Sequence, residues 1–213
     1  MKKFIRILLL ILTTIIIFIA ASNYFAKRSF LKSLKGEIVY VKRDGDILNV
    51  YKILANGKNK QLLYRHTGEQ NLNCSNPRWS RDGSKISFIA MKNGKWGSFI
   101  MNSDGGNVKA TKDKGDEPPV SLVSRENDII VRNGSVYYLN EKGNEMKVHK
   151  FMGYIPKFNE GASEASWSPD KKFIIFDSSE GTFLFVGHQG IFIASKDGKV
   201  VKIIDGMQPD WKY

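Results

Sequence analysis

Cysteine is almost missing from this sequence, which has one such residue, Cys74, among 213. A single thiol excludes a disulfide-stabilised scaffold and a cysteine-based zinc site, and we expect Cys74 to be a buried, inert thiol. Histidine is also scarce, and His66, His149 and His188 do not share the spacing of a metal-binding helix. We expect them at the surface or in loops. The sequence therefore predicts no metal and no cofactor.

Acidic residues are missing from the first 36 positions, which contain seven of the 33 Lys and Arg residues. The whole chain has a net charge of +12, whereas residues 36–213 have 26 cations against 21 acids, a net charge of +5. The excess positive charge therefore belongs to the N-terminus. Because no basic run lies outside that segment, we expect no nucleic-acid partner.

Charge is absent over residues 7–26, and this run of 20 residues is almost wholly aliphatic up to Ala21. As a helix it would be about 30 Å long, the thickness of a bilayer's hydrocarbon core. We predict a membrane anchor in residues 1–26, with the membrane contacted through residues 7–26, and a basic linker in residues 27–35. A cleaved signal peptide is the alternative, because Ala20-Ala21-Ser22 offers small residues for cleavage.

The location of the remaining chain follows from that choice. Lys and Arg residues flank the apolar run on both sides, so the positive-inside rule does not decide its orientation. We expect a single-pass protein of the cell membrane with residues 36–213 on the extracytoplasmic side. If the N-terminal segment is cleaved, these residues would be secreted.

After residue 35 the sequence shows no amphipathic helical pattern, and a short motif recurs every 44 residues instead. Its copies are residues 77–83, 165–171 and 209–211, which contain Trp79, Trp167 and Trp211. Trp167 and Trp211 are 44 residues apart, and Trp79 and Trp167 are 88 apart, which predicts a further copy around position 123. Residues 121–127 fit that copy, with Val123 in place of the tryptophan.

Each copy is followed by β-rich runs that are separated by polar turns, often Asp-Gly. Four short strands in about 44 residues are typical of a propeller blade. Residues 36–213 have room for about four such repeats. We predict a four-bladed β-propeller in which residues 209–211 complete the first blade beside residues 37–42. An open arc of four repeats that needs a partner is the alternative.

The best-preserved copy also carries a family resemblance. Trp167-Ser168-Pro169-Asp170, the apolar run at 173–176 and the later turn at 195–198 resemble the TolB-type propeller repeats of bacteria. The resemblance extends over residues 36–213 and is weakest at 121–144. Propellers of this kind can accompany a serine-peptidase domain, for which this chain has no room.

Candidate binding residues follow from the repeat register, since inner strands line the channel of a propeller. The positions one and three residues before each repeat tryptophan are Arg78, Leu122, Ser166 and Asp210, and Asn76, Val120, Glu164 and Gln208. The repeat tryptophans themselves are expected to pack between blades. Trp96 breaks the repeat near a loop, so it is a candidate contact residue.

The functional prediction is a non-enzymatic, membrane-tethered propeller that binds a protein or an envelope polymer. It rests on the apolar segment, the repeats and the lack of a recognisable catalytic motif. The alternative is a hydrolase or lyase with its site in the propeller channel.

Overall fold

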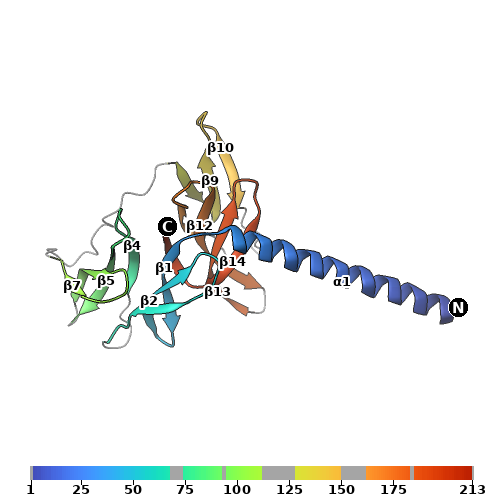
Figure 1. The fold of residues 1–213 in the computed structure, drawn as a ribbon, viewed down its shortest axis with the longest axis horizontal. Helices are drawn as coiled ribbons and strands as arrows, with labels where there is room; N and C mark the ends of the chain where they lie inside the picture. Colours follow the sequence, from blue (N-terminus) through green and yellow to red (C-terminus); the bar gives the residue numbers. More distant parts are fainter. Residues whose placement is uncertain are drawn as a thin grey trace. The chain divides into compact units, whose positions relative to one another are not determined.

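The chain changes from helix to strand at residue 36 in the computed structural model, which describes residues 2–67, 74–92, 95–111, 128–149, 162–182 and 185–212. Two compact units meet at this point, Met1–Lys35 and Gly36–Tyr213. The first is built from one helix, and the described part of the second is built from strands (Figure 1).

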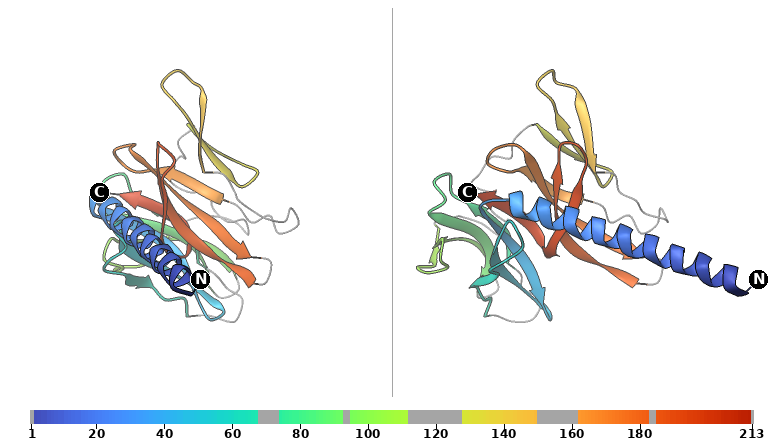
Figure 2. Two further views of the ribbon diagram at one scale, coloured as in Figure 1. Left: turned by 90° about the vertical axis from the view of Figure 1, so that its right-hand side faces the viewer. Right: turned by 45° about the vertical axis from the view of Figure 1, so that its right-hand side comes forward.

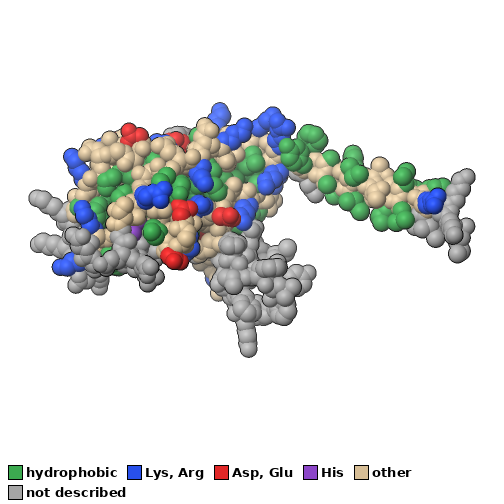
Figure 3. All heavy atoms as spheres, turned by 90° about the horizontal axis from the view of Figure 1, so that it is seen from below, with side chains coloured by type: hydrophobic (Ala, Val, Ile, Leu, Met, Phe, Trp, Pro, Cys, Tyr) green, Lys and Arg blue, Asp and Glu red, His purple; other side chains and the backbone are tan. Residues whose placement is uncertain are grey.

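Helix α1 (Lys2–Ser33) contains the predicted apolar segment and continues through most of the predicted basic linker. It does so because residues 26–35 contain neither Gly nor Pro, and the first helix-ending residue is Gly36, with φ of 92°. Hydrophobic side chains are exposed along the helix (Figure 3). Leu9–Ser33 is long and apolar enough to cross a membrane, and a signal sequence would meet the same criterion.

Four antiparallel sheets make up the described part of the second unit. We call them sheets A to D in the order in which their first hairpins occur along the chain. In sheet A the spatial order is β15 (Met207–Lys212), β1 (Glu37–Asp44), β2 (Ile47–Leu54) and β3 (Gln61–Tyr64). In sheet B it is β4 (Ser75–Trp79), β5 (Lys85–Lys92), β6 (Lys95–Asn102) and β7 (Lys109–Ala110).

Sheets C and D follow the same meander (Figure 2). Sheet C has the order β10 (Glu145–His149), β9 (Ser135–Leu139) and β8 (Ile129–Arg132). Sheet D has the order β11 (Ala162–Trp167), β12 (Phe173–Thr182), β13 (Phe185–Ser195) and β14 (Val200–Asp205). The repeats therefore form one sheet each, as the spacing predicted.

The polar pairs between strands form tight turns, as expected. Between β4 and β5, Gly83 has φ of 68° and its N–H donates to the Ser80 carbonyl at 2.9 Å. The Ser80 hydroxyl donates to the Asp82 carboxylate at 2.6 Å. Such turns use the tolerance of Gly for positive φ and the ability of a short acid to bond its own backbone.

The C-terminal strand completes the first sheet. β15 pairs antiparallel with β1, so that Trp211 lies opposite Ile38 and Asp210 opposite Val39. The strand that pairs with the inner edge of β1 therefore comes from the far end of the chain. This is the arrangement that the sequence predicted, because an unpaired inner strand would leave backbone donors and acceptors unsatisfied.

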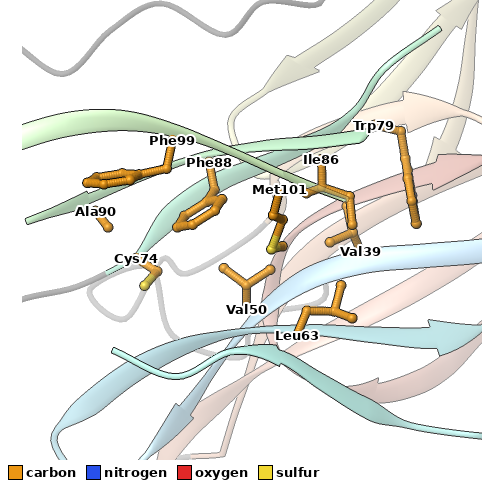
Figure 4. Packing of buried hydrophobic residues seen from close by; sticks show 10 residues of the cluster. All are labelled: Val39, Val50, Leu63, Cys74, Trp79, Ile86, Phe88, Ala90, Phe99 and Met101. Carbon is orange, nitrogen blue, oxygen red and sulfur yellow. The ribbon is translucent and has the colours of Figure 1, made fainter. Parts of the chain in front are cut away.

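Two buried clusters hold the sheets together. Val39, Val50 and Leu63 of sheet A pack against Trp79 and Phe88 of sheet B (Figure 4). A second cluster joins sheets C and D and contains, among others, Val136, Tyr138, Trp167, Ile174 and Phe176. β15 also contacts β11 and β12, which places sheet A beside sheet D.

The sheets therefore follow one another in the order B, A, D, C. Over the described ranges, no extensive contact joins sheet B directly to sheet C, so the described sheets form an arc that is not closed. Residues 112–127 connect these two sheets along the chain and contain the predicted copy around Val123. This segment, which includes the predicted channel residues Val120 and Leu122, lies outside the described residues.

Candidate functional site

The inner strands β4, β15 and β11 come together and bring five of the predicted channel residues into one network. Arg78 of β4 and Glu164 of β11 form an ion pair of 2.6 Å, and their side chains are only 8% and 16% exposed. This pair connects sheet B to sheet D, although sheet A lies between them in the arc. A charged pair with so little exposure is held together strongly, because breaking it would leave a buried charge without a partner.

Asp210 of β15 ties sheet A to sheet B. Its carboxylate accepts the backbone N–H of Trp79 at 2.7 Å. Burial raises the pKa of Asp210 above its ordinary value, against the opposing effects of Arg78 and of the N–H groups of Trp79 and Trp211. This carboxyl group therefore holds its proton more tightly than a carboxyl group in water.

Asn76 and Gln208 occupy equivalent places in β4 and β15. The Asn76 N–H donates to the Gln208 side-chain oxygen at 2.9 Å, and Arg78 donates to the Gln208 carbonyl at 3.4 Å. Both residues have positive φ, 49° for Asn76 and 54° for Gln208, and each precedes a proline. The pairing register of both strands shifts at these positions, so each inner strand has a bulge there.

A central residue of the network, Asp177, was not predicted. It lies on β12, is 1% exposed, and accepts the N–H groups of Glu164 at 2.8 Å and Gln208 at 2.9 Å. It thereby satisfies backbone donors that the bulges of β11 and β15 leave without strand partners. The only sequence signal was an acid at the end of the apolar run 173–176, where a buried strand would not carry one without a bonding partner.

Ser166 and Trp96 differ from the other predicted residues. The hydroxyl of Ser166 is enclosed and has no hydrogen-bond partner. Trp96 lies on β6, opposite Met91 of β5, and takes no part in the network. Five of the predicted positions on β4, β11 and β15 therefore lie in the network, whereas Trp96 belongs to a different part of sheet B.

The three repeat tryptophans pack between sheets, as predicted, and are 4–6% exposed. Trp79 lies in the cluster of sheets A and B, and Trp167 lies in that of sheets C and D. Trp211 stacks on Phe173 of sheet D with ring centres 6.2 Å apart. These residues are therefore part of the core and do not form a stacking platform for a ligand.

The remaining residues that could take part in catalysis or metal binding are Cys74 and the histidines. Burial raises the pKa of the Cys74 thiol to about 12, so this residue is not a nucleophile at neutral pH. His66 lies in the loop after β3, one of the two places expected, and its side chain is buried, at 3% exposed. Among the residues that the structure describes, no three His, Cys, Asp or Glu side chains are grouped to hold a metal ion. The side chain of His188 lies outside the described part.

No family model and no curated protein sequence matches the chain. Solved structures similar to it include TolB from Acinetobacter baumannii, at 15% identity and a TM-score of 0.34. A TolB protein from Agrobacterium tumefaciens follows, at 19% identity and a TM-score of 0.28. The chain is similar to TolB proteins. The matches cover 83% and 79% of this chain but only 43% and 62% of the TolB chains.

An enzyme is also among the similar structures. It is an oligogalacturonate lyase, solved in complex with manganese, at 15% identity and a TM-score of 0.30. The match covers 79% of this chain and 51% of the lyase. The chain thus spans about half the length of these three solved proteins.

Proposed function

We propose that this chain is a membrane-tethered β-propeller without catalytic activity, which presents its surface to a partner protein or an envelope polymer. The observation that supports this best is the engagement of the inner charged side chains. Arg78 is paired with Glu164, and Asp177 accepts two backbone N–H groups. Groups bonded in this way hold sheets together, and catalysis would require at least one of them to exchange this role for contact with a substrate.

The proposed tether is α1, with residues 7–26 in the bilayer and residues 36–213 on the extracytoplasmic side. If a peptidase removes the N-terminal segment, the same domain would be released. In either case the binding function belongs to residues 36–213, because α1 is a single apolar helix.

The proposed ring has four blades. Sheets A, B and D have four strands each, whereas the described part of sheet C has three. The repeat copy at residues 121–127 precedes β8 in the chain and lies outside the described residues. We propose that the four sheets are the blades of one closed ring.

The proposed contact positions are the predicted inner residues and, separately, Trp96. Two enclosed oxygen atoms support the first group, since Asn76 Oδ1 and Ser166 Oγ have no hydrogen-bond partner. A donor from a ligand or from a partner's side chain could satisfy them. The inner set is Asn76, Arg78, Glu164, Ser166, Gln208 and Asp210.

The test begins with the location of the domain. Intact cells, spheroplasts and inverted membrane vesicles are treated with protease, and fragments are detected with an antibody against residues 36–213. The proposal expects membrane-bound protein that is cleaved in spheroplasts and protected in inverted vesicles. Cleavage only in inverted vesicles would contradict it. Cross-linking in spheroplasts with Ser166→Ala and its exposed counterpart Ser84→Ala then tests whether an inner residue affects partner capture.

An enzyme is the second candidate, and one observation favours it. The Asp210 carboxyl group, whose pKa is raised by burial, interacts with Arg78 and Glu164, and two carboxyl groups in different surroundings are the pattern of an acid–base pair. The full-length protein should be screened against ester, peptide and glycan substrates. Turnover that is lost in Asp210→Asn but kept in Asp82→Asn, at an exposed turn, would establish this candidate and overturn the first.

A further inference from the structure

One end of the sheets is formed by the turns between first and second strands and between third and fourth strands; we call this end the turn face. Hydrogen bonds join neighbouring turns there. The Ser103 N–H of the β6–β7 turn donates to the Ser84 carbonyl of the β4–β5 turn at 3.0 Å. Lys212, at the end of β15, donates to the Gly83 carbonyl at 2.8 Å. The turn face is therefore a continuous surface across sheets A and B.

The same surface continues to sheets C and D. Lys171, in the β11–β12 turn, forms an ion pair of 3.4 Å with Asp128 directly before β8. The β9–β10 turn at residues 140–144 lies at this end as well, because the Leu139 N–H donates to the Asp128 carbonyl at 2.8 Å. Every described sheet thus contributes turns to the turn face.

Charges on the turn face are arranged unevenly. Acids of the tight turns bond within their own turn: Asp82 accepts from Ser80 and Ser84, and Asp170 accepts from Ser168 at 2.7 Å. These carboxylates stay ionised, because the bonds lower the pKa of Asp82 to about 2, and Asp170 also pairs with Lys172 at 3.4 Å. The cations are exposed and distributed over all four sheets, as Lys58, Arg81, Lys85, Lys142, Lys171 and Lys172.

The chain also connects α1 to this end of the domain. β1 begins at Glu37 on the turn face, as shown by the hydrogen bond of 3.0 Å from the Ala55 N–H of the β2–β3 turn to the Gly36 carbonyl. Only residues 34–36 separate β1 from the last residue of α1, Ser33. A link of that length spans at most about 14 Å between Ser33 and Glu37.

The length of α1 limits the distance between the membrane and the start of β1. Residues 7–26 match the hydrocarbon core, and residues 27–33 add about 10 Å of helix, enough to pass through the headgroup layer. The helix end and the link together place the first residue of β1 at most about 24 Å from the hydrocarbon core, which keeps the turn face within reach of the layer in which lipid phosphates lie. Exposed cations that come within a Debye length, about 8–10 Å, of that layer are attracted to an anionic leaflet.

We propose that the turn face binds the headgroups of anionic phospholipids in the same membrane that α1 spans. The proposal rests on the membrane tether of the proposed function and adds the surface of the domain that faces the lipid. The recognised group is the phosphodiester of a lipid such as phosphatidylglycerol. The tether raises the local concentration of these headgroups, so weak individual contacts are sufficient.

The test uses full-length protein in lipid nanodiscs, either pure phosphatidylcholine or a mixture with 30% phosphatidylglycerol. Amide hydrogen exchange is followed in the turns at residues 80–85 and 168–172, with the turn at 43–46, at the opposite end of sheet A, as internal reference. We expect exchange in the two turns to slow by about fivefold with the anionic lipid, and the effect to vanish in high salt. The reference turn should not change.

A charge variant and a matched control distinguish binding by the turn face from a general attraction of the basic protein to anionic lipid. The variant Arg81→Gln/Lys85→Gln/Lys171→Gln/Lys172→Gln removes four turn-face cations. The control Arg43→Gln/Arg65→Gln/Lys92→Gln/Lys95→Gln removes four exposed cations at the opposite end. We expect the first to lose the lipid-dependent protection and the second to keep it.

The outcomes also distinguish this inference from the tether. Protein that is extracted from membranes by alkaline carbonate would overturn the membrane anchor itself. If the protein resists carbonate but exchange in both turns is the same in the two lipids, the anchor stands and lipid binding by the turn face is wrong. Protection by a soluble polyanion such as polyphosphate, without any effect of phosphatidylglycerol, would also overturn it and identify the turn face as a polymer-binding surface.

Discussion

At the scale of single residues, two of the repeat tryptophans are covered by lysines from other parts of the chain. The Lys212 ammonium lies 3.9 Å from the ring centre of Trp79, and the Lys196 ammonium lies 5.1 Å from that of Trp167. Each indole thus contacts aliphatic and aromatic core on one side and a cation on the other. Cation–π contacts of this kind stabilise a partly desolvated lysine, and Lys212 also pairs with Glu37 at 3.3 Å.

Truncation of Trp167 should therefore lower the stability of the domain. We expect Trp167→Ala to lower the free energy of unfolding by about 3–5 kcal/mol, because the cavity opens in the cluster between sheets C and D. Trp96→Ala, on the partly buried β6 position, should cost less than half of that. Both values can be measured by denaturant unfolding of the full-length protein in detergent. A larger loss for Trp96→Ala would show that the repeat tryptophans are not the packing between sheets.

Asp44 makes the stability of the domain depend on pH. Burial alone would raise its pKa, but hydrogen bonds from Lys42, Tyr51 and Asn49 outweigh burial and lower the pKa to about 2. An unfolded Asp has a pKa of about 3.9, so the folded state favours the carboxylate. The stabilisation is therefore complete above about pH 5 and is lost as the pH falls toward 2.

Asp44→Asn should accordingly reduce the acid sensitivity of the domain. Between pH 5 and 2 we expect the melting temperature of the variant to fall less steeply than that of the natural protein. Asp46→Asn, at an exposed position two residues away, is the matched control and should leave the slope unchanged. Equal slopes for Asp44→Asn and the natural protein would mean that the bonds to Asp44 do not favour its ionised form.

At the scale of the elements, the inner strands share a bulge at the same place in the repeat. In β4, β11 and β15 the pairing register shifts two to four residues before the tryptophan. The bulge turns backbone N–H groups away from the neighbouring strand and toward side chains such as Asp177 and Gln208. This common distortion is what allows three inner strands from different sheets to bond to one another.

β15 is the element on which sheet A depends. Deleting residues 209–213 would remove the Trp211–Phe173 stack and the carboxylate of Asp210, and would expose the inner edge of β1. We expect loss of cooperative unfolding or self-association through the free edge. Size-exclusion chromatography and thermal melting would detect either result. Removal of Tyr213 alone, beyond the end of β15, is the control, and an unchanged monomer after the larger deletion would refute the role of β15.

At the scale of the whole molecule, the chain consists of an apolar helix and a β unit with separate tasks. We expect residues 36–213 expressed alone to be soluble with a far-ultraviolet circular dichroism spectrum of β-structure. The full chain should sediment with membranes. Leu12→Lys/Ile16→Lys, in the middle of the apolar run, is the control and should abolish sedimentation without altering the β spectrum. A helical spectrum for residues 36–213 would contradict the fold.

The sequence by itself determined the four sheets and the helix. Repeats are visible in a single chain because each sheet needs the same residues at the same strand and turn positions, such as Trp167 before the β11–β12 turn and Asp82-Gly83 between β4 and β5. For the same reason the pairing of β15 with β1 could be predicted from the two incomplete repeats at the ends of the domain.

Only the tertiary structure decided how the inner residues are used. The repeat register placed Arg78 one residue and Glu164 three residues before their tryptophans, but it could not show that they form an ion pair, since 86 residues separate them along the chain. Asp177 was missed because it lies on β12, outside the strands that were considered, and reaches the network only through the bulges of β11 and β15. Hydrogen bonds between sheets depend on the three-dimensional approach of strands from different repeats, and periodicity within one repeat carries no information about that approach.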